Sequence, residues 1–182
     1  MTYDDHLIAA AKRGDADAWR ELYRAHAGRL VVWLQRRAAG SNDAASDPDD
    51  ISNEAWLTAA RKIDGFHGSS DDFAGWLFGI ARKVSANVNR THERRQTAPL
   101  ALVPDLPIAG HEGAITEQAW LDDALAQLSP RERDVITCTE VVGLDVSATC
   151  EALGMTAVTV RVTRHRALKR LREILGVPVS IG

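Results

Sequence analysis

The sequence predicts an all-α protein made of two small helical domains that a flexible linker joins. Apolar residues recur with helical spacing along most of the 182 residues, and no convincing alternation of apolar and polar residues indicates a strand. Residues 96–118 interrupt this pattern with three prolines, two glycines and no lysine or arginine. The chain is therefore divided into a first block (residues 1–95), a linker (96–118), a second block (119–176) and a tail (177–182).

The first block is expected to open with two helices that Gly14 separates. Leu7, Ile8 and Ala11 belong to the first of these helices. Either Asp15 or Asp17 is placed to cap the second, because a carboxylate accepts hydrogen bonds from the free N–H groups of a first helical turn. The apolar face of that second helix is expected to point inward and consists of Ala18, Trp19, Leu22, Tyr23, Leu30, Trp33 and Leu34.

Two more helices are expected in the first block. Residues 47–50 read Asp-Pro-Asp-Asp, which places a capping acid before a proline at the first helical position and two acids at the positive end of the helix. Its inward residues are Ile51, Ala55, Trp56, Ala59 and Ile63. After a polar loop of residues 64–72, a fourth helix is expected from about Phe73 to a basic end at Arg90, Arg94 and Arg95.

The second block is expected to contain four shorter helices. Residues 129–132, Ser-Pro-Arg-Glu, form a capping box with proline at the first helical position. Asp145 is placed to cap the third helix, which ends at Leu153 and Gly154, and Thr156 is placed to cap the last. The prediction for residues 145–175 is a helix-turn-helix, in which the turn glycine takes a positive φ.

Composition excludes several classes of protein. A hydrophobic content of 45% and a charged content of 26% suit a globular chain, and a net charge of −3 does not suit a generic polyanion binder. No apolar run approaches the length of a transmembrane helix, and the N-terminus lacks the layout of a signal peptide. A cytoplasmic location is expected, with Cys138 and Cys150 as reduced, buried thiols.

No motif for catalysis, metal binding or cofactor binding is present. Phosphate-binding, dinucleotide-binding, zinc-protease and serine-hydrolase motifs are all missing. The six histidines have no zinc-like spacing with cysteine. We therefore expect a protein that is not an enzyme, with no catalytic residue, no metal and no cofactor.

The last helix carries the strongest indication of function. Between Thr156 and Leu175 the chain has six basic residues and one acidic residue, whereas residues 119–155 have two basic and seven acidic. Insertion of a helix into a major groove requires neutralisation of the phosphates around it. This pattern indicates DNA binding, although an ordinary basic surface helix would have a similar composition.

A second basic patch ends the first block. Five basic residues and one acidic residue lie between Arg82 and Arg95, and Phe73 and Trp76 precede them by one to two turns. Aromatic rings beside a basic track are the usual means of holding unstacked single-stranded bases. The alternative interpretation is that both rings belong to the core.

Taken together, four stretches resemble the extracytoplasmic-function (ECF) class of bacterial sigma factors. The first is AWRELYRAHAGRLVVWLQRRA, which is similar to the opening helix of the second sigma region. The next two are DPDDISNEAWLTAARKIDGF and FAGWLFGIARKVSANVNRTHERR, which resemble the polymerase-binding helix and the promoter-melting helix. The fourth is LSPRERDVITCTEVVGLDVSATCEALGMTAVTVRVTRHRALKRL, which resembles the fourth sigma region.

The resemblance implies a role for each block. Residues 1–95 would bind core RNA polymerase and read and melt the −10 element, and residues 119–176 would read the −35 duplex. The residues implied to bind polymerase are Asp50, Asn53, Glu54 and Arg61, although for the acids helix capping and a solvated face are the alternative. Those implied to contact −10 DNA are Phe73, Trp76, Arg82, Lys83, Asn87 and Arg90, beside a loop of residues 65–72 that would receive an extruded base. Those implied to contact −35 DNA are Thr156, Thr159, Arg161, Val162, Arg164 and His165.

The sequence also departs from the family pattern at a few of these positions. Asn53 stands where glutamine is usual, and Asn87 where many members carry aspartate. The function expected from the resemblance is promoter-specific transcription initiation, with core RNA polymerase, promoter DNA and an anti-sigma factor as partners. The alternative is a stand-alone helix-turn-helix regulator that binds an operator without polymerase, and a helical adaptor without DNA contact is a third.

Overall fold

The computed structural model describes residues 3–38, 47–96 and 117–176, and every regular element in these ranges is helical. The first domain comprises α1 (Tyr3–Lys12), α2 (Ala16–Ala38), α3 (Pro48–Lys62), the 3₁₀ turn η1 (Ile63–Gly65) and α4 (Ser70–Gln96). The second domain comprises α5 (Glu117–Ala126), α6 (Pro130–Ile136), the π-helical turn η2 (Thr137–Val141), α7 (Val146–Leu153) and α8 (Ala157–Leu175).

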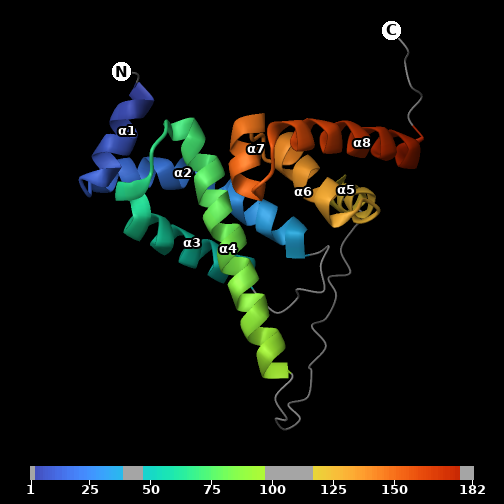
Figure 1. The fold of residues 1–182 in the computed structure, drawn as a ribbon, viewed down its shortest axis with the longest axis horizontal. Helices are drawn as coiled ribbons and strands as arrows, with labels where there is room; N and C mark the ends of the chain where they lie inside the picture. Colours follow the sequence, from blue (N-terminus) through green and yellow to red (C-terminus); the bar gives the residue numbers. More distant parts are fainter. Residues whose placement is uncertain (1–2, 39–46, 97–116, 177–182) are drawn as a thin grey trace.

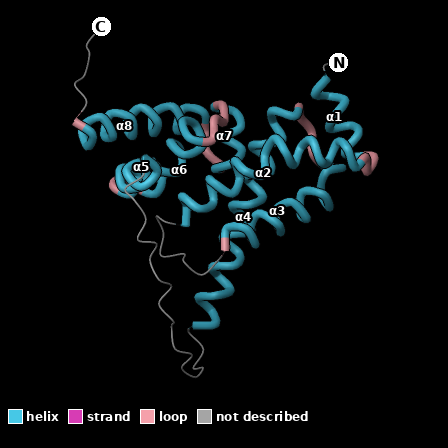
Figure 2. Tube along the Cα trace, turned by 180° about the vertical axis from the view of Figure 1, so that it is seen from behind, coloured by secondary structure: helices cyan, strands magenta, loops and turns pink. Residues whose placement is uncertain are grey.

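The two domains lie side by side, with α4 and α7 in contact where they meet (Figures 1 and 2). The C-terminal half of α4 projects away from both domains. The predicted all-α fold with two helical domains is confirmed. Residues 97–116, nearly all of the predicted linker, and the predicted tail of residues 177–182 lie outside the described residues.

The predicted capping residues at four helix starts are confirmed, and Asp15 is identified as the cap of a fifth helix. Asp47 accepts a hydrogen bond from the Asp49 amide (2.9 Å), and Asp15, rather than Asp17, accepts from the amide of Ala18 (2.9 Å). In the second domain Ser129 and Glu132 form the expected capping box, and Asp145 and Thr156 cap α7 and α8. Gly154 ends α7 with a φ of 65°, a left-handed conformation that favours glycine.

Two elements differ from the prediction. The fourth helix begins at Ser70 rather than near Phe73, because Asp72 accepts hydrogen bonds from the amide and hydroxyl of Ser69 and so fixes an earlier first turn. The helix that starts at Pro130 changes at Thr137 into the π-helical turn η2, where the Val142 amide donates to the carbonyl of Thr137 (2.9 Å).

The core of the first domain is an aromatic cluster around Phe73. The Phe73 side chain is 0% exposed, and its ring lies 5.6 to 6.5 Å from the rings of Trp19, His26, Trp56, Phe66 and Trp76, centroid to centroid. Aromatic pairs in this range stabilise a fold beyond their buried area by about 0.5–1.5 kcal/mol each. The cluster fixes the position of α4 relative to α2 and α3.

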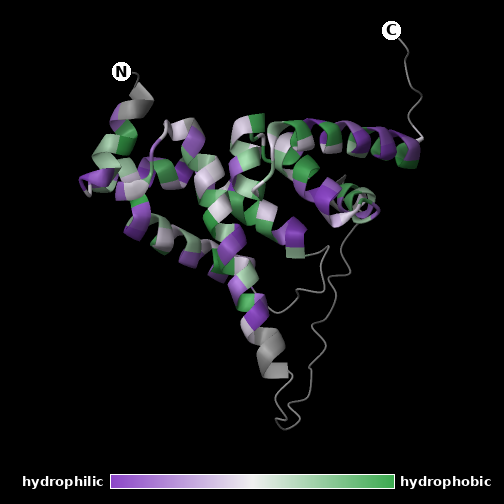
Figure 3. Ribbon diagram, viewed as in Figure 1, coloured by the Kyte–Doolittle hydropathy of each residue, from purple (hydrophilic) through white to green (hydrophobic). Residues whose placement is uncertain are grey.

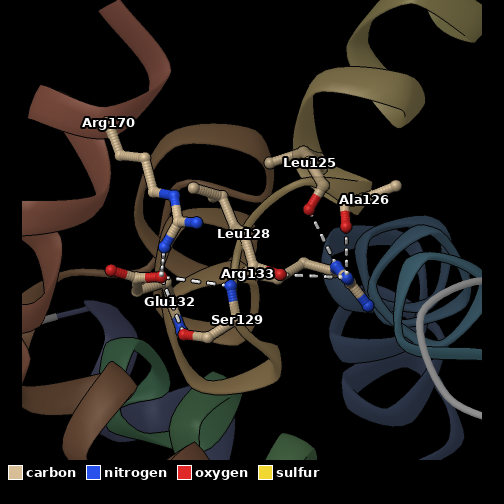
Figure 4. A network of polar contacts seen from close by, with 7 residues as sticks. All are labelled: Leu125, Ala126, Leu128, Ser129, Glu132, Arg133 and Arg170. Carbon is tan, nitrogen blue, oxygen red and sulfur yellow. Dashed lines mark hydrogen bonds and ion pairs between the residues drawn. The ribbon is translucent and has the colours of Figure 1, made fainter. Parts of the chain in front are cut away.

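A buried arginine closes the start of the second domain (Figure 4). Arg133 on α6 donates to the backbone carbonyls of Leu125 (3.0 Å), Ala126 (3.2 Å) and Leu128 (3.2 Å) at the end of α5. The Leu125 carbonyl also accepts from the Leu128 amide (3.1 Å), and the guanidinium adds donors at a helix end, where carbonyls run out of partners within the helix. Beside it, Glu132 accepts from Ser129, which holds the pKa of that carboxyl below its usual value, and lies 3.8 Å from Arg170 of α8.

The two domains share one continuous core because two glycines let α4 and α7 approach closely. A Cβ atom on Gly75 would lie 2.7 Å from the Cα and carbonyl oxygen of Ala148, and one on Gly79 would lie 3.1 Å from the carbonyl oxygen of Glu151. Buried residues of the second domain, among them Val135, Ala148 and Val160, therefore join the hydrophobic cluster of the first. This contact between the domains was not predicted from the sequence.

Four arginines of the first domain also reach the second. Arg29 donates to the Val142 carbonyl (2.7 Å) and Arg82 to the Ala152 carbonyl (3.0 Å). The other two form ion pairs across the boundary, Arg36 with Asp122 (3.0 Å) and Arg37 with Asp134 (2.7 Å). Burial raises the pKa of Asp134 and Arg37 opposes that rise. The boundary thus combines the apolar contact of α4 with α7 and polar contacts from these four arginines.

Gly75→Ala should loosen the contact between the domains by about 1–3 kcal/mol, because the added methyl group meets backbone atoms that cannot turn aside. The matched control is Gly28→Ala on α2, where a Cβ would meet nothing within 4 Å. There the change should stabilise the helix by up to about 1 kcal/mol. Urea unfolding and small-angle scattering measure both effects. Equal stabilisation of the two variants would contradict the close approach.

Candidate functional site

The exposed face of α3 carries all four residues expected to bind polymerase. Asp50, Asn53, Glu54 and Arg61 follow each other at spacings of three, one and seven residues, which places them on one side of the helix, and all four are exposed. Arg61 donates to Glu54 (2.7 Å), and Thr58 bonds to both side chains at 3.3 Å. The structure therefore brings this set together on an accessible surface.

The acidic residues of this face do not cap the helix. The capping oxygen at the start of α3 belongs to Asp47, which precedes the helix. Asp49 and Asp50 lie in the first turn, where negative charge is stabilised by the helix dipole. Glu54 lies one turn further along the helix, so neither capping nor the dipole accounts for its position.

An apolar hollow, which was not predicted from the sequence, adjoins this face. Tyr23 was expected to point into the core, but its side chain is 50% exposed and its ring lies 5.1 Å from that of Trp56. Leu57 is 59% exposed beside it. Together with Trp19 and Asn53 they line an open cavity of about 840 Å³. The signal available in the sequence was the spacing of Asn53 and Leu57, four residues apart on the acidic face.

The loop expected to receive a base borders a second hollow. Gly65, Phe66, His67, Asp72 and Trp76 line one side of a cavity of about 690 Å³. Trp76 is half-buried and its ring lies 4.9 Å from that of Phe66. The other side belongs to the second domain and includes Ser147, Cys150 and Met155. The hollow is thus bounded by both domains in this arrangement.

Phe73 does not share this hollow. It was expected, with Trp76, to contact −10 DNA, but its side chain is completely buried in the aromatic cluster. No face of the ring is open for a base to stack on. Its position fits the alternative interpretation, which is that Phe73 is a core residue. The centroid of its ring lies 5.6 Å from that of Trp76.

The remaining −10 residues fall on two different stripes of α4. Trp76, Lys83, Asn87 and Arg90 are spaced seven, four and three residues apart and share one side of the helix. This stripe spans about 21 Å at 1.5 Å per residue. On it Arg90 donates to the side chain of Asn87 (2.5 Å). Arg82 lies instead on the stripe of Gly75 and Gly79 and faces α7.

The basic helix α8 presents most of its expected contact residues to solvent. Arg161, Val162, Arg164 and His165 are exposed. Thr159 is half-buried, and its amide donates to Thr156 as part of the cap (3.3 Å). Arg164 donates to Glu140 (2.5 Å), and this hydrogen bond holds the pKa of Glu140 below its usual value. The ion pair joins α8 to η2, so Arg164 is the least free of the exposed set.

Neither a metal site nor a membrane-spanning helix is found in the parts of the chain that the structure describes. No three histidine, cysteine or acidic side chains are grouped so that they could hold a metal ion. Within the same residues, no helix combines the length and apolar character that crossing a membrane requires.

Comparison with known proteins identifies both domains. The family model described as Sigma-70 region 2 matches residues 22–95, and that described as Sigma-70, region 4 matches residues 118–171. An ECF RNA polymerase sigma factor of Caulobacter vibrioides, SigF, is 31% identical over 172 residues, which cover 92% of this chain and 90% of the relative. SigD of Mycobacterium tuberculosis is 28% identical, covering 93% of this chain and 82% of the relative.

Solved structures with the same fold are also found. CnrH, solved in complex with the cytosolic domain of CnrY, has a TM-score of 0.64 at 23% identity and covers 95% of this chain and 97% of that one. RpoE of Bartonella quintana, solved with the anti-sigma factor NepR, has a TM-score of 0.54 at 25% identity. The match covers 81% of this chain and 94% of RpoE. The chain belongs to the ECF family of bacterial RNA polymerase sigma factors.

Proposed function

We propose that this chain binds core RNA polymerase, directs it to a set of promoters and helps to open the DNA there. The observation that carries the proposal is the separation of three accessible surfaces on one chain of a sigma-factor family. They are the acidic face of α3, the aromatic and basic stripe of α4, and the basic side of α8. The chain would act in the cytoplasm with polymerase, and RNA synthesis itself would be the polymerase's reaction.

The acidic face of α3 is proposed as the polymerase contact. Asp50 and Glu54 lie four residues apart and project from a helix that the aromatic cluster holds in place. The exposed Leu57 and Tyr23 supply apolar area beside them. Interfaces combine such apolar anchors with charges that set orientation and association rate. The surface therefore suits a partner that offers basic and apolar side chains together.

The stripe of Trp76, Lys83, Asn87 and Arg90 is proposed to follow the unpaired −10 strand. Trp76 offers a ring at the edge of the hollow beside residues 65–72, and Lys83 and Arg90 supply positive charge further along. Stacking on such a ring stabilises a bound base by about 1–3 kcal/mol. That gain offsets part of the cost of unpairing, which is a few kcal/mol.

The contact between the two domains limits access to Arg82 and to the hollow beside Trp76. Arg82 donates to the carbonyl of Ala152, and α7 forms one wall of the hollow beside Trp76. We propose that α4 and α7 separate when the chain joins polymerase and promoter. An anti-sigma factor is proposed as a further partner, on the likeness to RpoE of Bartonella quintana, which is found in complex with NepR. Such a partner would act by covering the same surfaces.

Run-off transcription tests the proposal. The purified chain and core polymerase are assayed for binding to promoter DNA and for transcript, each alone and together. Specific transcription that requires both components supports the proposal. Tight, specific DNA binding by the chain alone would favour the stand-alone regulator, and no DNA effect in any mixture would favour the adaptor.

Arg161→Ala should weaken binding of the polymerase complex to promoter DNA by about 1–3 kcal/mol if Arg161 bonds a guanine edge. If Arg161 contacts only phosphate, the loss should be similar on every sequence and the salt dependence should fall by about one counterion. Fluorescence anisotropy over a range of salt concentrations distinguishes the two. Arg172→Ala at the other end of α8 is the control. Unchanged affinity for every promoter would remove Arg161 from the contact surface.

A further inference from the structure

Two valines stand on the outer side of the most basic helix. Val158 is 68% exposed and Val162 is 43% exposed, and they lie four residues apart on α8. The opposite side of the same helix carries Val160 and Ala167, both completely buried. Hydrophobic and hydrophilic residues consequently alternate along α8 (Figure 3). The apolar character of α8 therefore extends beyond the side that packs on the domain.

The stability of the fold does not account for Val158 and Val162. Valine is a weaker helix former than alanine, lysine or arginine, because its branched side chain loses freedom against the preceding turn. A helix surface gains nothing from it unless something packs there. Single exposed apolar residues are common on proteins, but two at the spacing of one helical turn form a continuous apolar strip. The strip points to a ligand with apolar groups.

The surroundings of the strip indicate what that ligand is. A shallow hollow of about 390 Å³ is lined by the two valines together with Ser129, Arg131, Glu132, Thr159, Thr163 and Arg166. Its one carboxylate, Glu132, already accepts from Ser129 and lies 3.8 Å from Arg170, so the arginines give the hollow its remaining charge. Arg161 and His165 are exposed on the same half of the helix. A ligand that fits this surface must carry dense negative charge and also present small apolar groups. The major groove of DNA does so, since phosphates flank it and thymine alone among the bases projects a methyl group into it.

We propose that Val158 and Val162 contact thymine methyl groups in the −35 duplex and thereby set part of its sequence preference. The proposal rests on the proposed function, because it names what α8 reads once the polymerase complex is on the promoter. Val158 is the second residue of α8 and Val162 the sixth, and a recognition helix places its N-terminal residues against base edges.

The spacing of the valines sets the spacing of the thymines. Four helical residues rise by about 6 Å, and successive bases on one strand by about 3.4 Å. The two contacted methyl groups should therefore lie one or two base-pair steps apart. The valines are also held still, because Thr156 caps the start of α8 and the Arg164–Glu140 ion pair fixes its middle to η2. A β-branched side chain on a fixed helix has few rotamers to lose on contact.

The test uses the complex of this chain with core polymerase. Duplexes randomised in the upstream contact region are selected with the wild-type complex and with complexes containing Val158→Ala or Val162→Ala. The wild type should enrich thymine at two positions one or two steps apart, and each variant should lose the preference at one of them. Val88→Ala is the matched control, an exposed valine on α4 off the stripe of Trp76, and should leave both preferences in place.

Replacement of thymine by deoxyuridine then removes the methyl group alone. At each selected position it should weaken binding of the wild-type complex about fourfold, the effect of one buried methyl-sized group. The same replacement should not weaken binding further in the complex that carries the corresponding alanine. Insensitivity of the wild-type complex to deoxyuridine would overturn the proposal.

Failure of the valine proposal is distinguishable from failure of the proposed function. The wild-type complex could transcribe from the selected promoters although its binding does not depend on the thymine methyl groups. That result would contradict only the role of the valines. If the chain directs no transcription at all, the proposed function is contradicted as well. If the alanine variants instead lost association with core polymerase and kept their thymine preference, the strip would be a protein contact and the proposal would be wrong.

Discussion

Glu54→Lys should abolish association with core RNA polymerase at concentrations where the wild-type chain binds fully. Glu54 stands in the middle of the exposed face of α3, between Asn53 and Leu57. Reversal of its charge places a cation where a basic partner surface is expected, and like charges brought together at an interface cost several kcal/mol. A loss of about 2–5 kcal/mol corresponds to roughly thirty-fold to several-thousand-fold in Kd.

The fold should survive this change. The Glu54–Arg61 ion pair lies on the surface, with 51% and 66% of the two side chains exposed, and pairs of this kind contribute about 0–1 kcal/mol. The matched control is Asp123→Lys, the same reversal at an exposed acid of α5 in the other domain. Native gel shift or surface plasmon resonance measures association, and circular dichroism measures the fold. Equal loss in both variants, or none in Glu54→Lys, would contradict the assignment of the α3 face.

Acidification should destabilise the first domain through His26. This side chain lies in the aromatic cluster, 5.7 Å from the ring of Phe73, and its Nδ1 has no hydrogen-bond partner among the described residues. Burial lowers its pKa from 6.5 to about 4, and the neighbouring Arg29 adds to this. The imidazole is therefore buried in its neutral form, and protonation requires a charge in an apolar site.

The direction of the pH effect follows from the lowered pKa. Between pH 6.5 and pH 4 the unfolded chain binds a proton at His26 that the folded chain does not bind. The free energy of unfolding should thus fall as the pH falls through this window, by about 3 kcal/mol in total, and should lose nothing further from this group below pH 4. Above pH 6.5 the His26 side chain is neutral in both the folded and the unfolded chain, so it makes no pH-dependent contribution to the free energy of unfolding.

Urea unfolding between pH 4 and pH 7.5 measures this dependence. His26→Gln removes the titration while it keeps a polar side chain of similar length. That variant should be less stable at neutral pH and should show a flatter curve through the same window. His67→Gln, at an exposed histidine of the loop after η1, is the matched control for the loss of a histidine. An unaltered slope in His26→Gln would show that another group titrates.

Local chemistry explains which features the sequence predicted well. Asp47, Ser129, Asp145 and Thr156 cap helices through hydrogen bonds that span only two or three residues, and Gly154 ends α7 through its own φ. Such features depend on neighbours in the chain and hardly on the rest of the fold. The acidic face of α3 was predictable for the same reason, since one helix places all of its residues.

Burial was harder to predict, because amphipathic spacing gives the side of a helix and not the depth of a side chain. Phe73 and Trp76 both follow the apolar pattern of α4, but only Trp76 reaches the surface. Tyr23 follows the inward pattern of α2 and remains half exposed, with its ring 5.1 Å from that of Trp56 on α3. Which of several apolar residues is covered depends on the neighbouring helices.

The sequence by itself determined the helices, most of their ends, the concentration of charge on α8 and the exposed acids of α3, since each follows from residues within a few turns. Only the tertiary structure decided that Gly75, Gly79 and Arg82 form a stripe against α7, and that the two domains share one core. The physical reason is range. Glycines of a helix look alike in sequence, and they become a contact only when another backbone, more than 70 residues away, comes within about 4 Å of them.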